Sequence, residues 1–130
     1  MKGTKPQLRE ALPQEIAEVT AAPEWLAEEA RKEWDRVMPI LLDRKILTDA
    51  DLGGLENYCI CIGRVRETEA KIQIETDPEM MLKLIRVQDK AMASARQLAA
   101  ELGLTPVSRS RPAIREDEDG DDSPNPLGLV

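Results

Sequence analysis

The chain has 130 residues, of which 42% are hydrophobic, 33% are charged and only 2% are aromatic, and its net charge at pH 7 is −7. This length suits a single domain, and a core made of Leu, Ile, Val, Met and Ala favours helices over a β-sandwich. The sequence contains no histidine, which removes the commonest general base and the commonest metal ligand. We therefore expect an all-α protein that is not an enzyme and that holds neither a metal nor a cofactor.

Residues 1–22 mix three cations (Lys2, Lys5 and Arg9) with prolines and show little apolar periodicity, so we expect a flexible basic arm. The first 14 residues lack the apolar stretch of a signal peptide. No apolar run in the chain approaches membrane-spanning length. These features predict a cytoplasmic protein with no membrane partner.

The first helix is expected to begin at Pro23 and Glu24, because a missing amide is harmless in a first turn and a carboxylate suits the helix dipole. An apolar stripe at spacings of three and four follows: Leu26, Ala30, Trp34, Val37 and Leu41. Pro39 falls inside this pattern. It predicts either a kink or a helix that ends near Met38 and is followed by a short second piece.

The second helix is predicted to start at Thr48, which forms a capping-box pattern with Asp51. Its apolar face comprises Leu52, Leu55, Tyr58, Cys59, Ile62 and Val65. Gly53 and Gly54 together cost about 1–2 kcal/mol of helix stability relative to alanines. We therefore expect another segment to pack close to the backbone at this glycine pair.

The third helix is predicted to start at Asp77 as N-cap with Pro78 at its first position, and to end before Gly103. The turn at residues 75–78 is short enough to join the second and third helices as an antiparallel hairpin. The third helix carries a second apolar stripe besides its core-facing one. Because three helices cannot easily cover both stripes, we expect a homo-oligomer with these interface candidates: Met81, Ile85, Met92 and Ala99.

The C-terminal end is acidic, since residues 112–130 contain six acids against Arg115 and carry −5 of the total charge. This segment of Pro, Gly, Ser and acidic residues cannot build a core, and we expect it to be disordered when free. The predicted organisation is therefore an arm over residues 1–22, a helical core over residues 23–111 and a tail over residues 112–130.

Motifs of catalysis and metal binding are not found in the sequence. "GTKPQ" lacks the Gly-Lys-Ser/Thr end of a phosphate-binding loop. The acidic run at residues 116–122 lacks the spaced bidentate glutamate of a calcium loop. Cys59 and Cys61 would lie about 200° apart on a helix, so we interpret both as reduced, partly buried side chains rather than a disulfide or a zinc pair.

Cations cluster at several places along the helical core. In a single copy, a solvated helix face with salt bridges to neighbouring acids explains them. In an oligomer the same cations would repeat as a belt that binds DNA phosphates in a salt-dependent manner. Together with the arm, the DNA-binding candidates are Lys2, Lys5, Arg9, Arg31, Lys32, Arg36, Arg44, Lys45, Arg64 and Arg66.

Four short segments share an order and spacing with a known family. They are "PEWL" at residues 23–26, "EW" at 33–34, "ILTDAD" at 46–51 with Leu55 and Tyr58-Cys59 after it, and "GLTP" at 103–106 with Arg109. Residues 22–111 thereby resemble the small terminase subunit of tailed bacteriophages, in the branch with a GLTPxxR-type end to its last helix. The chain departs from that pattern between the second and third helices, where a longer segment is compressed to "IETDPEMM".

The resemblance implies a non-catalytic DNA-packaging factor of the host cytoplasm that forms a helical, ring-shaped oligomer. Such a protein binds viral double-stranded DNA and passes it to the large terminase subunit, which carries the ATPase and the nuclease. Arg109 and Arg111 would anchor the exit of the last helix on a neighbouring subunit or on phosphate. The tail would dock on the large subunit through three apolar residues: Leu127, Leu129 and Val130.

Two other functions fit parts of the sequence. A helical oligomer that acts only as a protein–protein scaffold, without DNA binding of its own, is favoured by the net charge of −7. A small helix-turn-helix repressor is disfavoured, because the predicted helices are too long and too acidic for a recognition helix. The sequence gives no indication of a small-molecule substrate.

Overall fold

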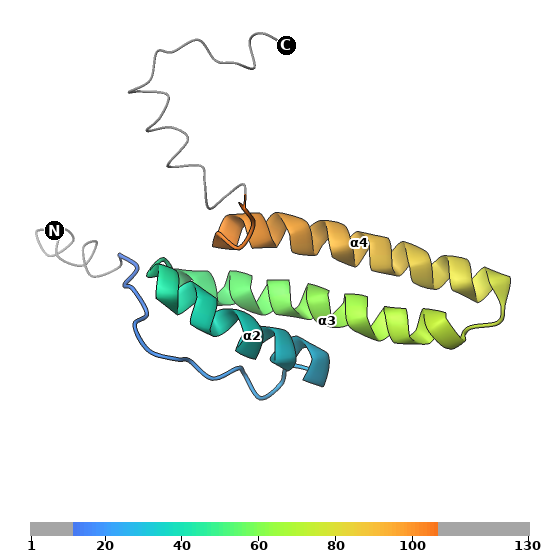
Figure 1. The fold of residues 1–130 in the computed structure, drawn as a ribbon, viewed down its shortest axis with the longest axis horizontal. Helices are drawn as coiled ribbons and strands as arrows, with labels where there is room; N and C mark the ends of the chain where they lie inside the picture. Colours follow the sequence, from blue (N-terminus) through green and yellow to red (C-terminus); the bar gives the residue numbers. More distant parts are fainter. Residues whose placement is uncertain (1–11, 107–130) are drawn as a thin grey trace, which may run out of the picture.

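The computed structural model describes residues 12–106 of the chain. They form α2 (Glu28–Arg44), a 3₁₀ helix η1 (Asp49–Asp51), α3 (Leu52–Ile74) and α4 (Pro78–Leu102). α3 and α4 run antiparallel as a long hairpin (Figure 1). Within the described residues no strand occurs, and Glu15 and Thr48 form only an isolated bridge. The predicted all-helical fold with three main helices is confirmed.

The first helix begins later than the sequence predicts. α2 starts at Glu28 rather than at Pro23, because residues 23–26 form a turn in which the amide of Leu26 donates to the carbonyl of Pro23 at 3.2 Å. The Arg31 guanidinium stabilises this turn by donating to the carbonyls of residues 23, 24 and 26. The apolar stripe that begins at Leu26 is nevertheless buried, as predicted.

Pro39 does not end the first helix. α2 runs on to Arg44 with Pro39 inside it, so of the two predicted alternatives the helix that ends near Met38 is wrong. Pro39 is exposed, and the carbonyl that loses its amide partner on that face can be hydrated by water.

The predicted caps of the later elements are confirmed. Thr48 and Asp51 form a capping box around η1. Asp77 accepts a hydrogen bond from the amide of Met80 at 3.0 Å, with Pro78 at the start of α4. Gly103 adopts φ 80°, and the amide of Leu104 donates to the carbonyl of Ala99 at 2.8 Å, which closes α4 in a Schellman motif.

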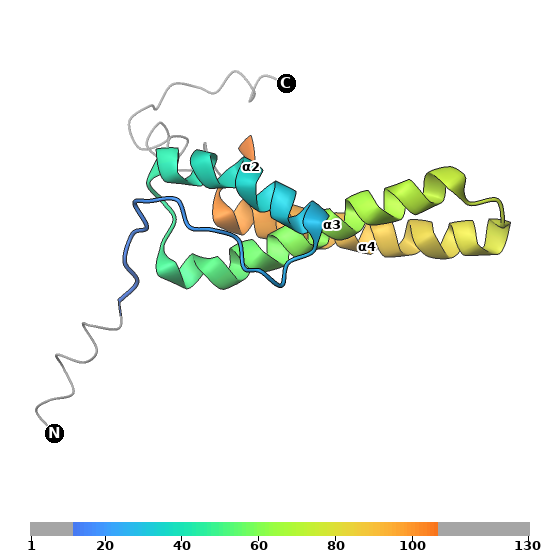
Figure 2. The same ribbon diagram turned by 90° about the horizontal axis from the view of Figure 1, so that it is seen from below.

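Residues 12–22, which the sequence places in a flexible arm, are bound to the helical core. The Trp34 indole donates to the carbonyl of Thr20 at 2.8 Å, and the amide of Ile16 donates to the carbonyl of Leu47 at 2.8 Å. Figure 2 shows this segment running alongside α2. Lys2, Lys5 and Arg9 lie outside the described residues.

α2 covers only part of the hairpin. It packs along the half of α3 that follows η1, and the other end of the hairpin projects beyond it (Figures 1 and 2). The core lies where the three helices meet and includes Trp34, Val37, Leu41, Leu55, Cys59, Ala95 and Leu102. Toward the hairpin turn, large apolar side chains are exposed, among them Ile74 and Leu82. None of the described helices has both the length and the apolar character needed to span a membrane.

The close backbone approach expected at Gly53 and Gly54 occurs at Gly63 instead. A Cβ atom at Gly63 would lie 2.9 Å from the backbone nitrogen of Ala30, so only glycine allows α2 to lie this close to α3. A Cβ at Gly53 or Gly54 would meet nothing within 4 Å. The glycine that shapes the helix contact is therefore Gly63.

We predict that Gly63→Ala lowers the free energy of unfolding by about 1–3 kcal/mol, because the added methyl group must push two backbones apart. Gly53→Ala and Gly54→Ala are matched controls and should each raise it by up to about 1 kcal/mol through helix propensity alone. Urea unfolding at one fixed protein concentration measures all three. A Gly63→Ala variant as stable as the native chain would contradict the observed contact.

Candidate functional site

The carboxylate of Glu33 lies between α2 and α3, and the residue is only 1% exposed. Its Oε1 accepts hydrogen bonds from Arg36 Nε at 2.9 Å and from Arg66 Nη2 at 2.7 Å. Its Oε2 accepts from Arg36 Nη2 at 2.7 Å and from the Tyr58 hydroxyl at 2.6 Å. We call these four residues the Glu33 cluster. Both oxygens are satisfied, so the charge is buried with its partners in place.

The electrostatics of the Glu33 cluster favour the charged carboxylate. Burial alone would raise the pKa of Glu33, but hydrogen bonds from Arg36 and Tyr58 and the charges of Arg36 and Arg66 outweigh it. The pKa of Glu33 therefore lies below its usual value. Burial also raises the pKa of the neighbouring Cys59 thiol to about 12, which keeps it protonated at neutral pH. The cluster is thus a structural ion-pair network.

Several of the predicted DNA-binding cations are engaged within the chain. Arg36 and Arg66 belong to the Glu33 cluster, and Arg31 holds the turn before α2. Lys32 forms an ion pair with Glu29 at 3.0 Å. The Arg44 guanidinium donates to the carbonyl of Gly103 and so joins the ends of α2 and α4. These side chains have structural partners that a phosphate would have to replace.

Two predicted cations in the described part differ from the others. Lys45 is exposed at the end of α2 in a left-handed conformation, with φ 58°. Arg64 is exposed on α3 and lies at a shallow groove of about 250 Å³ between α3 and α4. We call this the hairpin groove; the residues that line it are Cys61, Arg64, Val87, Lys90, Ala91 and Ser94.

Five further cations of the hairpin were not among the predicted DNA-binding residues, and all are exposed: Lys71 on α3 and Lys83, Arg86, Lys90 and Arg96 on α4. Within residues 12–106, the ion pairs involve only Lys32, Arg36 and Arg66 as cations. The spacing of three and seven residues from Lys83 was a signal in the sequence, because it places Lys83, Arg86 and Lys90 on one helix face.

The predicted oligomer-interface stripe is partly exposed in the single chain. Ile85 is 37% and Met92 is 42% exposed, and Leu82, which the sequence analysis did not select, is 54% exposed. Met81 and Ala99 are half-buried. We call Leu82, Ile85 and Met92 the apolar flank of α4. Arg109, Arg111, Leu127, Leu129 and Val130 lie outside the described residues.

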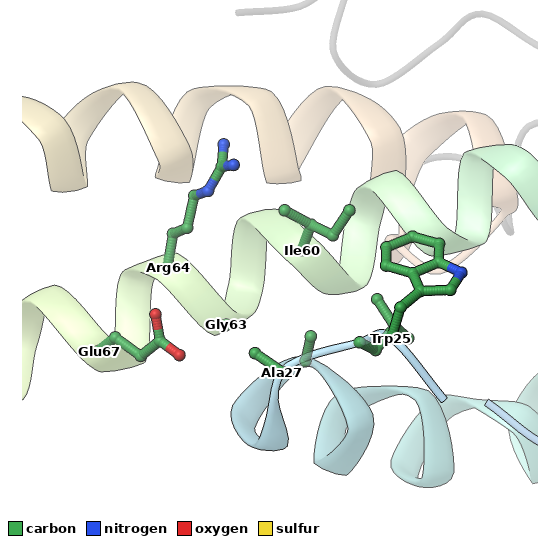
Figure 3. A pocket seen from close by; sticks show the side chains of 8 residues that line it. Trp25, Ala27, Ile60, Gly63, Arg64 and Glu67 are labelled. Atoms are coloured by element: carbon green, nitrogen blue, oxygen red, sulfur yellow. The ribbon is translucent and has the colours of Figure 1, made fainter. Parts of the chain in front are cut away.

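A separate pocket of about 240 Å³ lies where the start of α2 meets α3 (Figure 3). Trp25, which is 64% exposed, and Gly63 form part of its lining together with other apolar residues. Arg64 and Glu67 are the charged side chains that line it. Among the described residues no group of three His, Cys, Asp or Glu side chains is placed to hold a metal ion.

Comparison with known proteins identifies the family. The sequence model of the family described as "Phage terminase, small subunit" matches residues 30–119. This match spans more than half of the chain and includes η1, α3, α4 and nearly all of α2. The chain therefore belongs to the phage terminase small-subunit family, whose members are generally non-catalytic packaging factors. No curated protein and no solved structure gives a significant match.

We predict that Glu33→Gln lowers the free energy of unfolding by about 1–3 kcal/mol at pH 7, because two guanidinium groups lose their buried anion. The folded-state pKa of Glu33 is depressed, so its stabilisation is present above the unfolded pKa of about 4.3 and is lost as pH falls through the folded pKa. The gap between native chain and variant should therefore begin to narrow below about pH 4.3 and shrink further as the pH falls.

Urea unfolding from pH 3 to pH 7 measures that gap, with Glu29→Gln as the control because Glu29 pairs with the exposed Lys32. A gap that stayed constant down to the lowest pH, or an equal loss in the control, would contradict the role assigned to the buried carboxylate.

Proposed function

We propose that this chain is a small terminase subunit that assembles into a homo-oligomer, binds viral double-stranded DNA and recruits and regulates the large terminase subunit. The family match over residues 30–119 carries this proposal, because it covers the helical core as a unit. The "GLTP" that follows α4 at residues 103–106 supports placement in the branch with a GLTPxxR-type end. The protein acts in the host cytoplasm, where packaging takes place.

The apolar flank of α4 supports self-association. Ile85 and Met92 lie two turns apart on one face, and exposure of several large apolar side chains together on a helix is costly in water. A second copy is a suitable cover, because homo-oligomers bury the same surface on each subunit. Repetition of the chain in a ring would also repeat every cation that faces DNA.

The alternative function, a protein–protein scaffold without DNA binding, is favoured by the net charge of −7. Retention on immobilised double-stranded DNA at increasing salt separates the two functions. The packaging subunit should bind with an affinity that falls steeply as salt rises, because phosphate contacts release counterions. A scaffold should pass through the column at every salt concentration.

We predict that Met92→Lys and Ile85→Lys reduce the mass of the protein in solution, because a charge on the apolar flank cannot be buried without a partner. Light scattering on a sizing column, at low and high salt, measures the mass. Gln97→Lys on the exposed face of α4 is the matched control and should keep the native mass. A native protein that runs as a single chain at both salt concentrations would refute the oligomer.

Deletion of residues 116–130 is predicted to abolish stimulation of the large subunit's ATPase while the oligomer and its DNA binding remain. The apolar side chains of Leu127, Leu129 and Val130 are the expected contacts, so their triple replacement by serine should have the same effect. An ATPase assay with purified large subunit measures both variants. Full stimulation by the truncated chain would remove the tail from this role.

A further inference from the structure

The cations of the hairpin are distributed over both sides of the hairpin groove. Arg64 and Lys90 line the groove from α3 and from α4 respectively. Figure 3 shows the Arg64 side chain extending from α3 in the direction of α4. Lys71 lies seven residues after Arg64, and Lys83 lies seven residues before Lys90. Seven residues are close to two helical turns, so all four side chains share the face of the groove.

Arg86 adds a fifth cation, one turn before Lys90 on the same helix. All five side chains are exposed, and within residues 12–106 none of them forms an ion pair. The acids one helical turn from them along the same helices are Glu67, Glu75, Glu79 and Asp89, which the five cations outnumber by one. None of these acids lies within ion-pair distance of the five cations, in contrast to Glu33, which pairs with Arg36 and Arg66.

We propose that the hairpin groove, flanked by Arg64, Lys71, Lys83, Arg86 and Lys90, is the surface that contacts the phosphate backbone of double-stranded DNA. The inference rests on the proposed function. It replaces most of the cations that the sequence suggested with cations that form no ion pair within residues 12–106. DNA that binds there displaces the water and counterions around these cations and forms phosphate contacts in their place. No structural ion pair has to break.

The dimensions of the groove fit such a partner. Each row of cations extends about 10 Å along its helix, since seven residues rise 1.5 Å each. Duplex DNA carries about one phosphate charge per 1.7 Å of its axis, so a stretch of that length presents about six charges. Lysine and arginine aimed at phosphate carry no base preference, and the groove therefore contributes affinity rather than sequence specificity.

The groove stays accessible when the apolar flank of α4 is covered. Ile85 is two residues from Lys83 and Met92 is two residues from Lys90, and two residues correspond to about 200° of rotation around the helix. Ile85 and Met92 thus point to nearly the opposite side of α4 from Lys83 and Lys90, whereas Leu82 and Arg86, four residues apart, share a face between the two. A subunit that packs over Ile85 and Met92 leaves Lys83 and Lys90 open, and an oligomer presents one copy of the groove per subunit.

The test compares Lys83→Gln/Lys90→Gln with Lys32→Gln/Lys45→Gln, in the full chain. Both double variants remove two positive charges, and the second pair lies on and just after α2, away from the groove. Fluorescence anisotropy with a short labelled duplex measures affinity over a range of salt concentrations. The groove variant should bind at least tenfold more weakly near 0.1 M salt, and its salt dependence should fall by about 2 in log–log slope. The control should bind as the native chain does.

Equal losses in the two variants would overturn the groove as the DNA surface and leave the proposed function standing. If the native chain does not bind the duplex at low salt, the proposed function and the groove both fail. The acidic residues 116–122 of the chain are an alternative occupant. A labelled peptide of residues 112–122 that binds the native chain, loses binding in the groove variant and is not displaced by duplex would also overturn the proposal.

Discussion

The buried carboxylate of Glu33 fixes how α2 lies on α3. Its oxygens are satisfied only when Tyr58 and Arg66, eight residues apart on α3, both reach it. Gly63 lies between these two positions and allows the backbone of Ala30 to approach. A shift by one residue along α3 would leave an unpaired charge inside the protein and would bring a side chain into that contact. Charge satisfaction and close packing thus select the same register.

The contact between α2 and α3 also determines which cations have partners within the fold. α2 carries its own acids and meets α3, so the cations near that contact are used in the fold, as Arg36 and Arg66 are. Among residues 12–106 no third helix covers the hairpin beyond α2, and Lys71 and Lys83 there form no ion pair. The exposed apolar side chains of Ile74 and Leu82 lie toward the same end of the hairpin.

Much of the fold could be predicted from short sequence patterns. The Asp77 cap, the Gly103 stop and the apolar stripe through Trp34 are each decided within a few residues, and each was predicted correctly. Glu33 was not identified, because a glutamate three residues before an arginine is typical of an exposed helix pair. Gly63 was missed in favour of Gly53, since the sequence does not show which glycine meets another backbone. Contacts between distant segments decided these positions.

The candidate DNA surface shows why net charge was a poor guide. The chain carries −7, but residues 112–130 account for −5 of it. At physiological salt, charges farther apart than about 8 Å are largely screened from each other. A phosphate in the hairpin groove therefore responds to Arg64, Lys90 and their neighbours rather than to the sum over the chain. An acidic protein can bind a polyanion when its acids are paired or remote and its cations are unpaired and close together.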